Sequence, residues 1–174
     1  MAGDSGDIRT ARRWDIALAC VAGALIVAAV GVATAVALPP SLSNLASEVS
    51  DGVTATAVGD ASVVVPADWI ITRESDDAIS VTTPDGVLRA RLDVVSETPA
   101  ETVERSPASS ALRTEMLASG LTAVHADFDD GGLVAGVGSP DAPPSVRVVV
   151  EVRAAHDAAQ YRAAIGELLE GVRA

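Results

Sequence analysis

The segment Val87–Val95 has the sequence VLRARLDVV, in which apolar and charged side chains alternate. Successive side chains of a β-strand point to opposite faces of the sheet, so this alternation predicts a strand with one buried and one solvated face. The buried face would carry Leu88, Ala90, Leu92 and Val94, and the solvated face would carry Arg89, Arg91 and Asp93. A second segment repeats the pattern with four inward-facing valines: Val146, Val148, Val150 and Val152. The two segments predict a sheet with one side buried.

Shorter β-prone segments lie on both sides of Val87–Val95 and are separated by turn residues. Gly59-Asp60, Pro84-Asp85-Gly86 and Asp129–Gly132 each join two such segments, and Gly, Pro and Asp at these places favour tight turns. The segments predicted as further strands are 53–58, 62–65, 69–73, 78–83, 121–128 and 133–137. Tight turns between consecutive strands predict a mainly antiparallel sheet.

The sequence also predicts a helix that ends just before Gly120. Ser106 is a suitable N-cap, Pro107 suits the first helical position, and glycine is typical just past a helix end. Leu112 and Met116 are spaced to face the core from this helix. Residues 96–105, which precede it, are polar and are expected to form a loop.

A last helix is predicted from about Asp157. Its apolar stripe consists of Tyr161, Ile165, Leu168, Leu169 and Val172. Such a stripe faces the core of a globular domain. Strands, helix, strands and helix in this order predict an α+β fold, a mainly antiparallel sheet with helices packed on it.

The segment Ile16–Leu38 contains 23 residues and no charged side chain. As a helix it would be roughly 34 Å long, which is enough to cross a hydrocarbon core of about 30 Å. Residues 9–13 hold three arginines, and the next cation after the segment is Arg73. Because positive charge near a span stays in the cytoplasm, residues 1–15 are predicted to be a cytoplasmic tail and residues 39–174 to lie outside. The chain would contact the lipid bilayer through residues 16–38.

A cleaved signal peptide is the alternative interpretation of this segment. Ala33-Thr34-Ala35 and Ala35-Val36-Ala37 match the small-x-small pattern of cleavage sites. The apolar segment is longer than the core of about 7–15 residues in most signal peptides, which favours retention as an anchor. Cleavage would give a secreted domain, so both interpretations place residues 39–174 outside the cytoplasm.

The rest of the chain is expected to be a linker or short helix over residues 39–52 and one α+β domain over residues 53–174. The net charge of −12 lies after Leu38, because the first 15 residues balance three Asp against three Arg. A domain this acidic is not expected to bind nucleic acid. Cys20 is the only cysteine and lies in the apolar segment, so the domain has no internal disulfide.

Two histidines have neighbours with chemistry-bearing side chains. His125, Asp127 and Asp129 alternate along one predicted strand, and an imidazole with two carboxylates is a ligand set for a divalent cation. The other interpretation, which we favour, is a solvated strand face that runs into an acidic turn. His156-Asp157 is either an acid–base pair or the start of the last helix, where a carboxylate favours the positive end of the dipole.

The outer face of the two long strands would carry a row of arginines: Arg89, Arg91, Arg147 and Arg153. Pairing with Asp93 and Glu151 across strands is the favoured interpretation of this row. The sequence shows no nucleophile elbow and no Gly-rich phosphate loop, and neither histidine has an identifiable orienting partner. We therefore expect no catalytic residue, no cofactor and no metal ligand.

The order of elements over residues 53–174 resembles the PsbP-like family of extracytoplasmic domains. The resemblance is carried by Val63–Trp69 (VVVPADW), the turn Pro84-Asp85-Gly86 and the closing helix Tyr161–Arg173. It implies a non-catalytic binding or assembly module. The expectation is thus a single-pass membrane-anchored protein, not an enzyme, that presents such a module to a protein partner outside the cell. The alternatives are a secreted or anchored carrier of a small ligand and a metal-dependent exported enzyme built on His125.

Overall fold

The computed structural model describes residues 47–108, 110–153 and 158–174 of the chain. The chain divides into two units, Met1–Ser43 and Asn44–Ala174, and the described residues belong to the second. The predicted tail, the membrane segment and its cleavage sites therefore lie outside the described residues. Within the described ranges, no helix is long and apolar enough to span a membrane.

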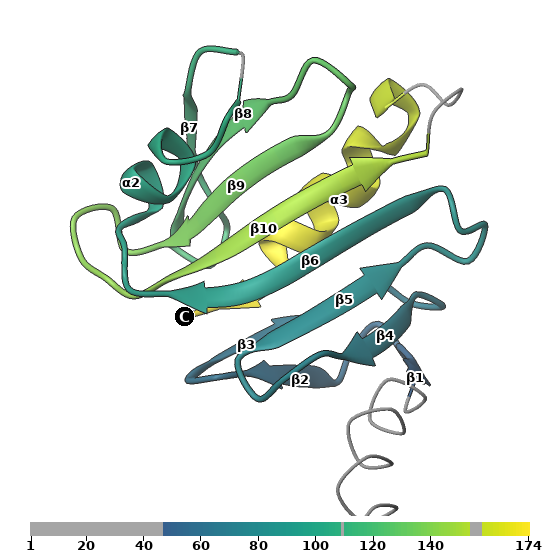
Figure 1. Cartoon of the computed structure of the whole chain (residues 1–174). Helices are drawn as coiled ribbons and strands as arrows, with labels where there is room; N and C mark the ends of the chain where they lie inside the picture. Colours follow the sequence, from purple (N-terminus) through teal and green to yellow (C-terminus); the bar gives the residue numbers. More distant parts are fainter. Residues whose placement is uncertain (1–46, 109, 154–157) are drawn as a thin grey trace, which may run out of the picture. The chain divides into compact units, whose positions relative to one another are not determined.

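An antiparallel sheet of eight strands forms the centre of the domain (Figure 1). In spatial order its strands are β1 (Ser47–Val49), β4 (Ile70–Arg73), β5 (Ala78–Thr82), β6 (Leu88–Val95), β10 (Ser145–Val152), β9 (Leu133–Gly138), β8 (Thr122–Asp127) and β7 (Arg113–Met116). The two alternating segments of the sequence are the central strands β6 and β10. They pair along their whole length, with Leu92 opposite Val148. The predicted antiparallel sheet is confirmed.

One face of this sheet is covered by a helix and by a second, smaller sheet. The helix is α3 (Arg162–Glu170), which follows a short 3-10 helix, η1 (Ala158–Tyr161). The smaller sheet contains β2 (Ala55–Val58), β3 (Ala61–Val64) and β11 (Val172–Arg173), in the order β11-β3-β2. In Figure 1 both lie behind the large sheet. The main core is therefore enclosed between two layers.

This core contains the residues that the alternation and the helical stripe predicted. Leu88, Leu92 and Leu168 are fully buried in it. Val172 is also fully buried, although it was predicted on the helix and instead begins β11, opposite Val63. The apolar stripe of α3 thus continues directly into a strand of the smaller sheet.

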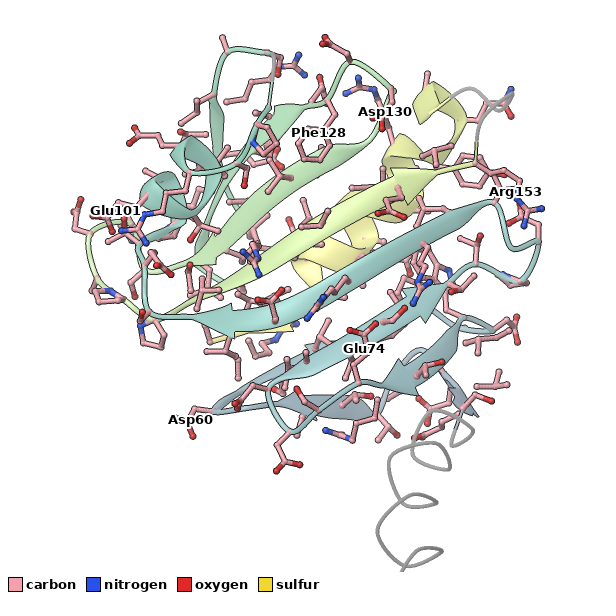
Figure 2. All side chains as sticks on the ribbon, in the orientation of Figure 1. Asp60, Glu74, Glu101, Phe128, Asp130 and Arg153 are labelled. Carbon is pink, nitrogen blue, oxygen red and sulfur yellow. The ribbon has the colours of Figure 1, made fainter. Side chains whose placement is uncertain are left out.

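A short helix, α2 (Pro99–Glu104), lies on the opposite face of the large sheet, over β8, β9 and β10 (Figure 1). Val103 of α2 is buried in a small apolar cluster with Val124 of β8 and Val134 of β9. Gly136 of β9 allows this close approach, because an added Cβ would lie 2.8 Å from the Cα of Pro99. On this face β6 carries charged side chains, and Figure 2 shows Glu74 beside them. The second face is therefore apolar under α2 and charged beyond it.

Both predictions for residues 96–120 are wrong. Residues 96–105 are not only a loop, because they contain α2, which begins with a capping box. The Thr98 hydroxyl accepts a hydrogen bond from the Glu101 N–H at 3.4 Å, and the Glu101 carboxylate accepts one from the Thr98 N–H at 3.0 Å. The predicted helix before Gly120 is absent from the described residues, which form strand β7 there instead.

Tertiary pairing explains why β7 is a strand. Its residues pair with β8, with Arg113 opposite His125, and this long-range pairing overrides the local helix preferences of the segment. Leu112 and Met116, predicted to face the core, are 45% and 81% exposed. Gly120 has a φ of +83° and lies in the turn between β7 and β8, so the glycine marks a hairpin.

The predicted linker 39–52 includes residues of the folded domain. Ser47–Val49 form β1, antiparallel to β4 at one border of the large sheet. Ser50 is buried, and its hydroxyl donates a 2.6 Å hydrogen bond to the carbonyl oxygen of Val65. A strand of three exposed residues has no alternation that the sequence could reveal.

One carboxylate links the β5–β6 turn to the start of α3. Asp85 accepts hydrogen bonds from the Thr83 hydroxyl at 2.5 Å, the Val87 N–H at 3.0 Å and the Tyr161 hydroxyl at 2.7 Å. These bonds stabilise the ionised carboxylate and lower the pKa of Asp85 to about 2. The same contact with Asp85 raises the pKa of Tyr161.

We expect this link to be sensitive to acid. The pKa of Asp85 in the folded state lies below the unfolded value of about 3.9, so its contribution to stability is present above about pH 4 and is lost as the pH falls towards 2. In an NMR titration of carboxyl carbons, Thr83→Val should raise the pKa of Asp85 most, since the Thr83 hydroxyl makes the largest contribution. Tyr161→Phe should raise it less. An unchanged midpoint in both variants would contradict the link.

Candidate functional site

A pocket of about 220 Å³ lies between α3 and the strands β7 and β8. Leu133, Ile165 and Leu169 supply its apolar lining, from β9 and from the inward stripe of α3. Polar side chains reach it from β7, from β8 and from the first turn of α3, namely Glu115, His125, Asp127 and Arg162. An apolar cavity with a few convergent polar groups is the usual form of a ligand site.

His125 is placed here by the alternation of β8. It stands between Arg113 of β7 and Ala135 of β9 in the sheet, on the face that α3 covers. Its side chain is 13% exposed, and its Nε2 lies 3.8 Å from a carboxylate oxygen of Glu115. Its Nδ1 is buried and has no hydrogen-bond partner among the described residues. An unpartnered buried ring nitrogen is uncommon, because it loses water without gaining a replacement.

The rim of the pocket is formed by an ion-pair group centred on Asp127. Its carboxylate lies 3.0 Å from the guanidinium of Arg113 and 3.8 Å from that of Arg162. Both arginine side chains are more than half exposed, so each pair contributes little to stability, about 0–1 kcal/mol. These ion pairs therefore fix the positions of the charged side chains at the pocket mouth and add little to the stability of the fold.

The three residues proposed as a metal set do not converge. His125 and Asp127 share the pocket face of β8, as their spacing predicted, but Asp129 lies exposed in the turn after the strand. Among the residues that the structure describes, no group of three or more His, Cys, Asp and Glu side chains is placed to hold a metal ion. The other candidate pair, His156-Asp157, lies outside the described residues.

Three arginines of the predicted row, Arg89, Arg91 and Arg147, line a second cavity, of about 360 Å³, on the opposite face of the sheet. The fourth, Arg153, follows the end of β10 and does not line it. Arg147 lies directly across from Asp93 and donates to both of its oxygens, at 3.2 and 2.7 Å. This confirms the predicted pairing with Asp93, whereas Glu151, which lies opposite Arg89, forms no ion pair among the described residues. Arg89 and Arg91 each lie 3.4 Å from an oxygen of Glu74, a partner that the sequence did not indicate. The charges of this cavity thus pair largely with one another.

Sequence reasoning missed most of the pocket around His125. Glu115 was assigned to a helix, so its position beside His125 was not foreseen. Arg162 and Gly166 come from the last helix, whose face was predicted but not its place over β8. The residues of β7 offer no signal for this, because Arg113, Thr114 and Glu115 are all polar and exposed and therefore show no apolar alternation.

Comparison of the chain with protein-family models, with curated proteins and with solved structures finds no match in any of the three. The PsbP-like resemblance is therefore carried by the residues quoted above alone.

Proposed function

We propose that the chain is a single-pass membrane protein that presents a non-catalytic, PsbP-like binding module outside the cell. Residues 16–38 serve as the anchor, residues 1–15 stay in the cytoplasm, and the domain from Ser47 onward contacts a protein partner. The uncharged apolar segment and the arginines before it support the topology.

The observation that carries the binding role is the pocket at His125. It combines an apolar lining, a ring nitrogen without a partner and a charged mouth in one place. A pocket of about 220 Å³ suits one inserted side chain of a partner, and such buried anchor residues supply much of the affinity of protein interfaces.

Photocrosslinking in intact cells tests this role. A photoreactive amino acid in place of Arg162, at the pocket mouth, should crosslink to the partner, and one in place of exposed Ser75 should not. Gly166→Leu should abolish the crosslink from position 162, because a Cβ at Gly166 meets no atom within 4 Å and a larger side chain would extend into the pocket. Equal crosslinking from positions 162 and 75 would contradict the proposal.

The topology is tested separately with single cysteines in a Cys20→Ala background. Ser75→Cys should react with an impermeant thiol reagent on intact cells, whereas Ser5→Cys should react only after lysis. The full-length chain should remain in the membrane after an alkaline wash. Labelling of Ser5→Cys from outside would contradict the orientation, and a shorter species in the medium would show a cleaved signal peptide instead of an anchor.

A small-ligand carrier is the second candidate, and the apolar lining of the pocket favours it. The volume of about 220 Å³ is below the roughly 300–1,000 Å³ of sites for drug-sized molecules, but above the roughly 150 Å³ that holds benzene. Native mass spectrometry of the detergent-released chain would show a small bound mass, which Gly166→Ala should retain and Gly166→Leu should lose. A mass retained in both variants would place the ligand elsewhere.

A further inference from the structure

Strand β7 forms one border of the eight-stranded sheet, and no strand of the described residues lies beyond it (Figure 1). All four of its residues are exposed. Two large apolar side chains, Leu112 just before the strand and Met116 at its end, are 45% and 81% exposed. Unpaired backbone groups on such a border are a template for another strand.

The hydrogen bonds of the β7–β8 hairpin show which residues turn their backbone towards this free border. The Leu117 N–H donates to the carbonyl oxygen of Leu121 at 2.9 Å, so this pair is hydrogen-bonded. Hydrogen-bonded pairs alternate along an antiparallel ladder, so Arg113 and Glu115 bond towards β8 as well. Thr114 and Met116 therefore direct their N–H and C=O groups outward.

We propose that the chain forms a homodimer by antiparallel pairing of β7 with β7 of a second copy, centred on Thr114. The segment Leu112–Met116 (LRTEM) is self-complementary about Thr114. In this register Arg113 faces Glu115 of the second copy on the face that carries His125. Leu112 faces Met116 of the second copy on the other face. Opposite charges and apolar pairs across strands both stabilise a sheet.

The charges also exclude the neighbouring registers. Only alternate residues of β7 direct N–H and C=O groups outward. Sliding one copy along the other therefore keeps these groups opposite each other only when the shift is two residues. A pairing centred on Arg113 would place arginine opposite arginine, and a pairing centred on Glu115 would place glutamate opposite glutamate. Both are unfavourable, because like charges directly opposite each other destabilise a sheet. The Thr114 register alone is in phase, charge-matched and two-fold symmetric, as an interface between identical chains requires.

The strand at the other border of the sheet lacks this property. β1 (Ser47–Val49) has one charged residue, Glu48, at its centre, so self-pairing centred there would oppose two glutamates. A lone charge of one sign is a common device against association of strand edges. The two borders therefore differ in the way expected if only β7 self-associates.

A pairing of about five residues is shorter than a stable dimer interface usually needs, since specific interfaces bury about 1,200–2,000 Å². We infer that the pairing forms between copies in one membrane, where anchoring raises their effective concentration. In this respect the inference rests on the proposed anchor. The pairing would place two His125 pockets beside the two-fold axis, because Glu115 lines the pocket and also faces the second copy.

Disulfide crosslinking of the full-length chain in membranes tests the register. In a Cys20→Ala background, Thr114→Cys should give a crosslinked homodimer on mild oxidation, because Cα atoms of a hydrogen-bonded antiparallel pair are about 5.5 Å apart, within disulfide range. Ser75→Cys, exposed at the β4–β5 turn, is the matched control and should stay monomeric. Crosslinking of Thr114→Cys to a different chain, or no more homodimer than in the control, would overturn the proposal.

Charge exchange separates the interface from any effect on folding. Adding Arg113→Glu or Glu115→Arg to Thr114→Cys should lower association roughly tenfold, because two attractive pairs become repulsive. Co-expressing the two variants with different tags should restore crosslinking between them, since each Glu then faces an Arg. Failure of this rescue would overturn the register. Alkaline extraction of the same membranes reports on the anchor independently, so loss of anchoring and loss of pairing are distinguishable.

Discussion

Leu168→Ala is expected to lower the free energy of unfolding by about 2–5 kcal/mol. Leu168 is fully buried in α3, where the helix packs on the central strands of the large sheet. The substitution removes several methyl and methylene groups and leaves a cavity that the surrounding strands cannot fill without shifting. Urea unfolding can be followed by the fluorescence of Trp69, which is 5% exposed, in a Trp14→Phe background.

Leu112→Ala is the matched control, because it makes the same chemical change at a leucine that is 45% exposed. Its cost should be below about 1 kcal/mol, since much of the side chain is already in contact with water. Equal losses in the two variants would contradict the placement of Leu112 outside the core, and a small loss for Leu168→Ala would contradict the packing of α3.

Gly136→Ala is expected to destabilise the domain by about 1–3 kcal/mol through overpacking. The new Cβ would lie 2.8 Å from the Cα of Pro99 and closer still to the Pro99 carbonyl oxygen, so it meets backbone that must move. The expected response is displacement of α2, with exposure of Val103, Val124 and Val134. Urea unfolding gives the loss, and amide hydrogen exchange of α2 locates it.

Gly166→Ala provides the opposite control for a glycine-to-alanine change. An added Cβ at Gly166 meets no atom within 4 Å, and the residue lies inside α3, where glycine costs about 1 kcal/mol relative to alanine. This variant should therefore be as stable as the unchanged chain or more stable by up to about 1 kcal/mol. A destabilised Gly166→Ala together with a neutral Gly136→Ala would reverse both interpretations.

The large sheet was predictable because its central strands have one buried and one solvated face. The alternation of β6 and β10 identified buried Leu88, Leu92 and Val148 correctly, and Gly59-Asp60 and Pro84-Asp85-Gly86 lie at the predicted turns. The stripe of the last helix was equally informative, since Ile165, Leu168 and Leu169 are buried. In each case the signal is a period of two or of 3.6 residues imposed by one buried face.

Prediction failed where no such period exists. The short strands β1 and β7 are exposed along their whole length, so burial imposes no pattern on them. The capping box of Thr98 and Glu101 was present in the sequence but was followed by only one turn and a half of helix, too short for a visible stripe. The helix signals from Ser106 to Gly120 were local preferences that pairing with β8 overrode.

The candidate site depended still more on long-range arrangement. The sequence placed His125 and Asp127 on one face of a strand, and the structure confirms this. It could not place Glu115, Arg162 and Leu169 around them, because these residues come from β7 and α3, up to 54 positions apart in the chain. Nor could it show that Asp129 lies apart from them, because Asp129 is two residues beyond the end of β8, in a turn where side chains no longer alternate.

The sequence by itself determined which faces of the strands and of the last helix are buried, where the hairpins turn, and that one uncharged segment of membrane-spanning length precedes the domain. The tertiary structure alone decided which strands form the two borders of the sheet among the described residues, which side chains surround His125, and which arginine pairs with which carboxylate. The physical reason is that burial of apolar surface acts along each segment and leaves a periodic trace in it. Tertiary packing brings α3 to β8 and Glu74 to Arg89 of β6. These residues are far apart in the chain, and no repeating pattern in the sequence relates their positions.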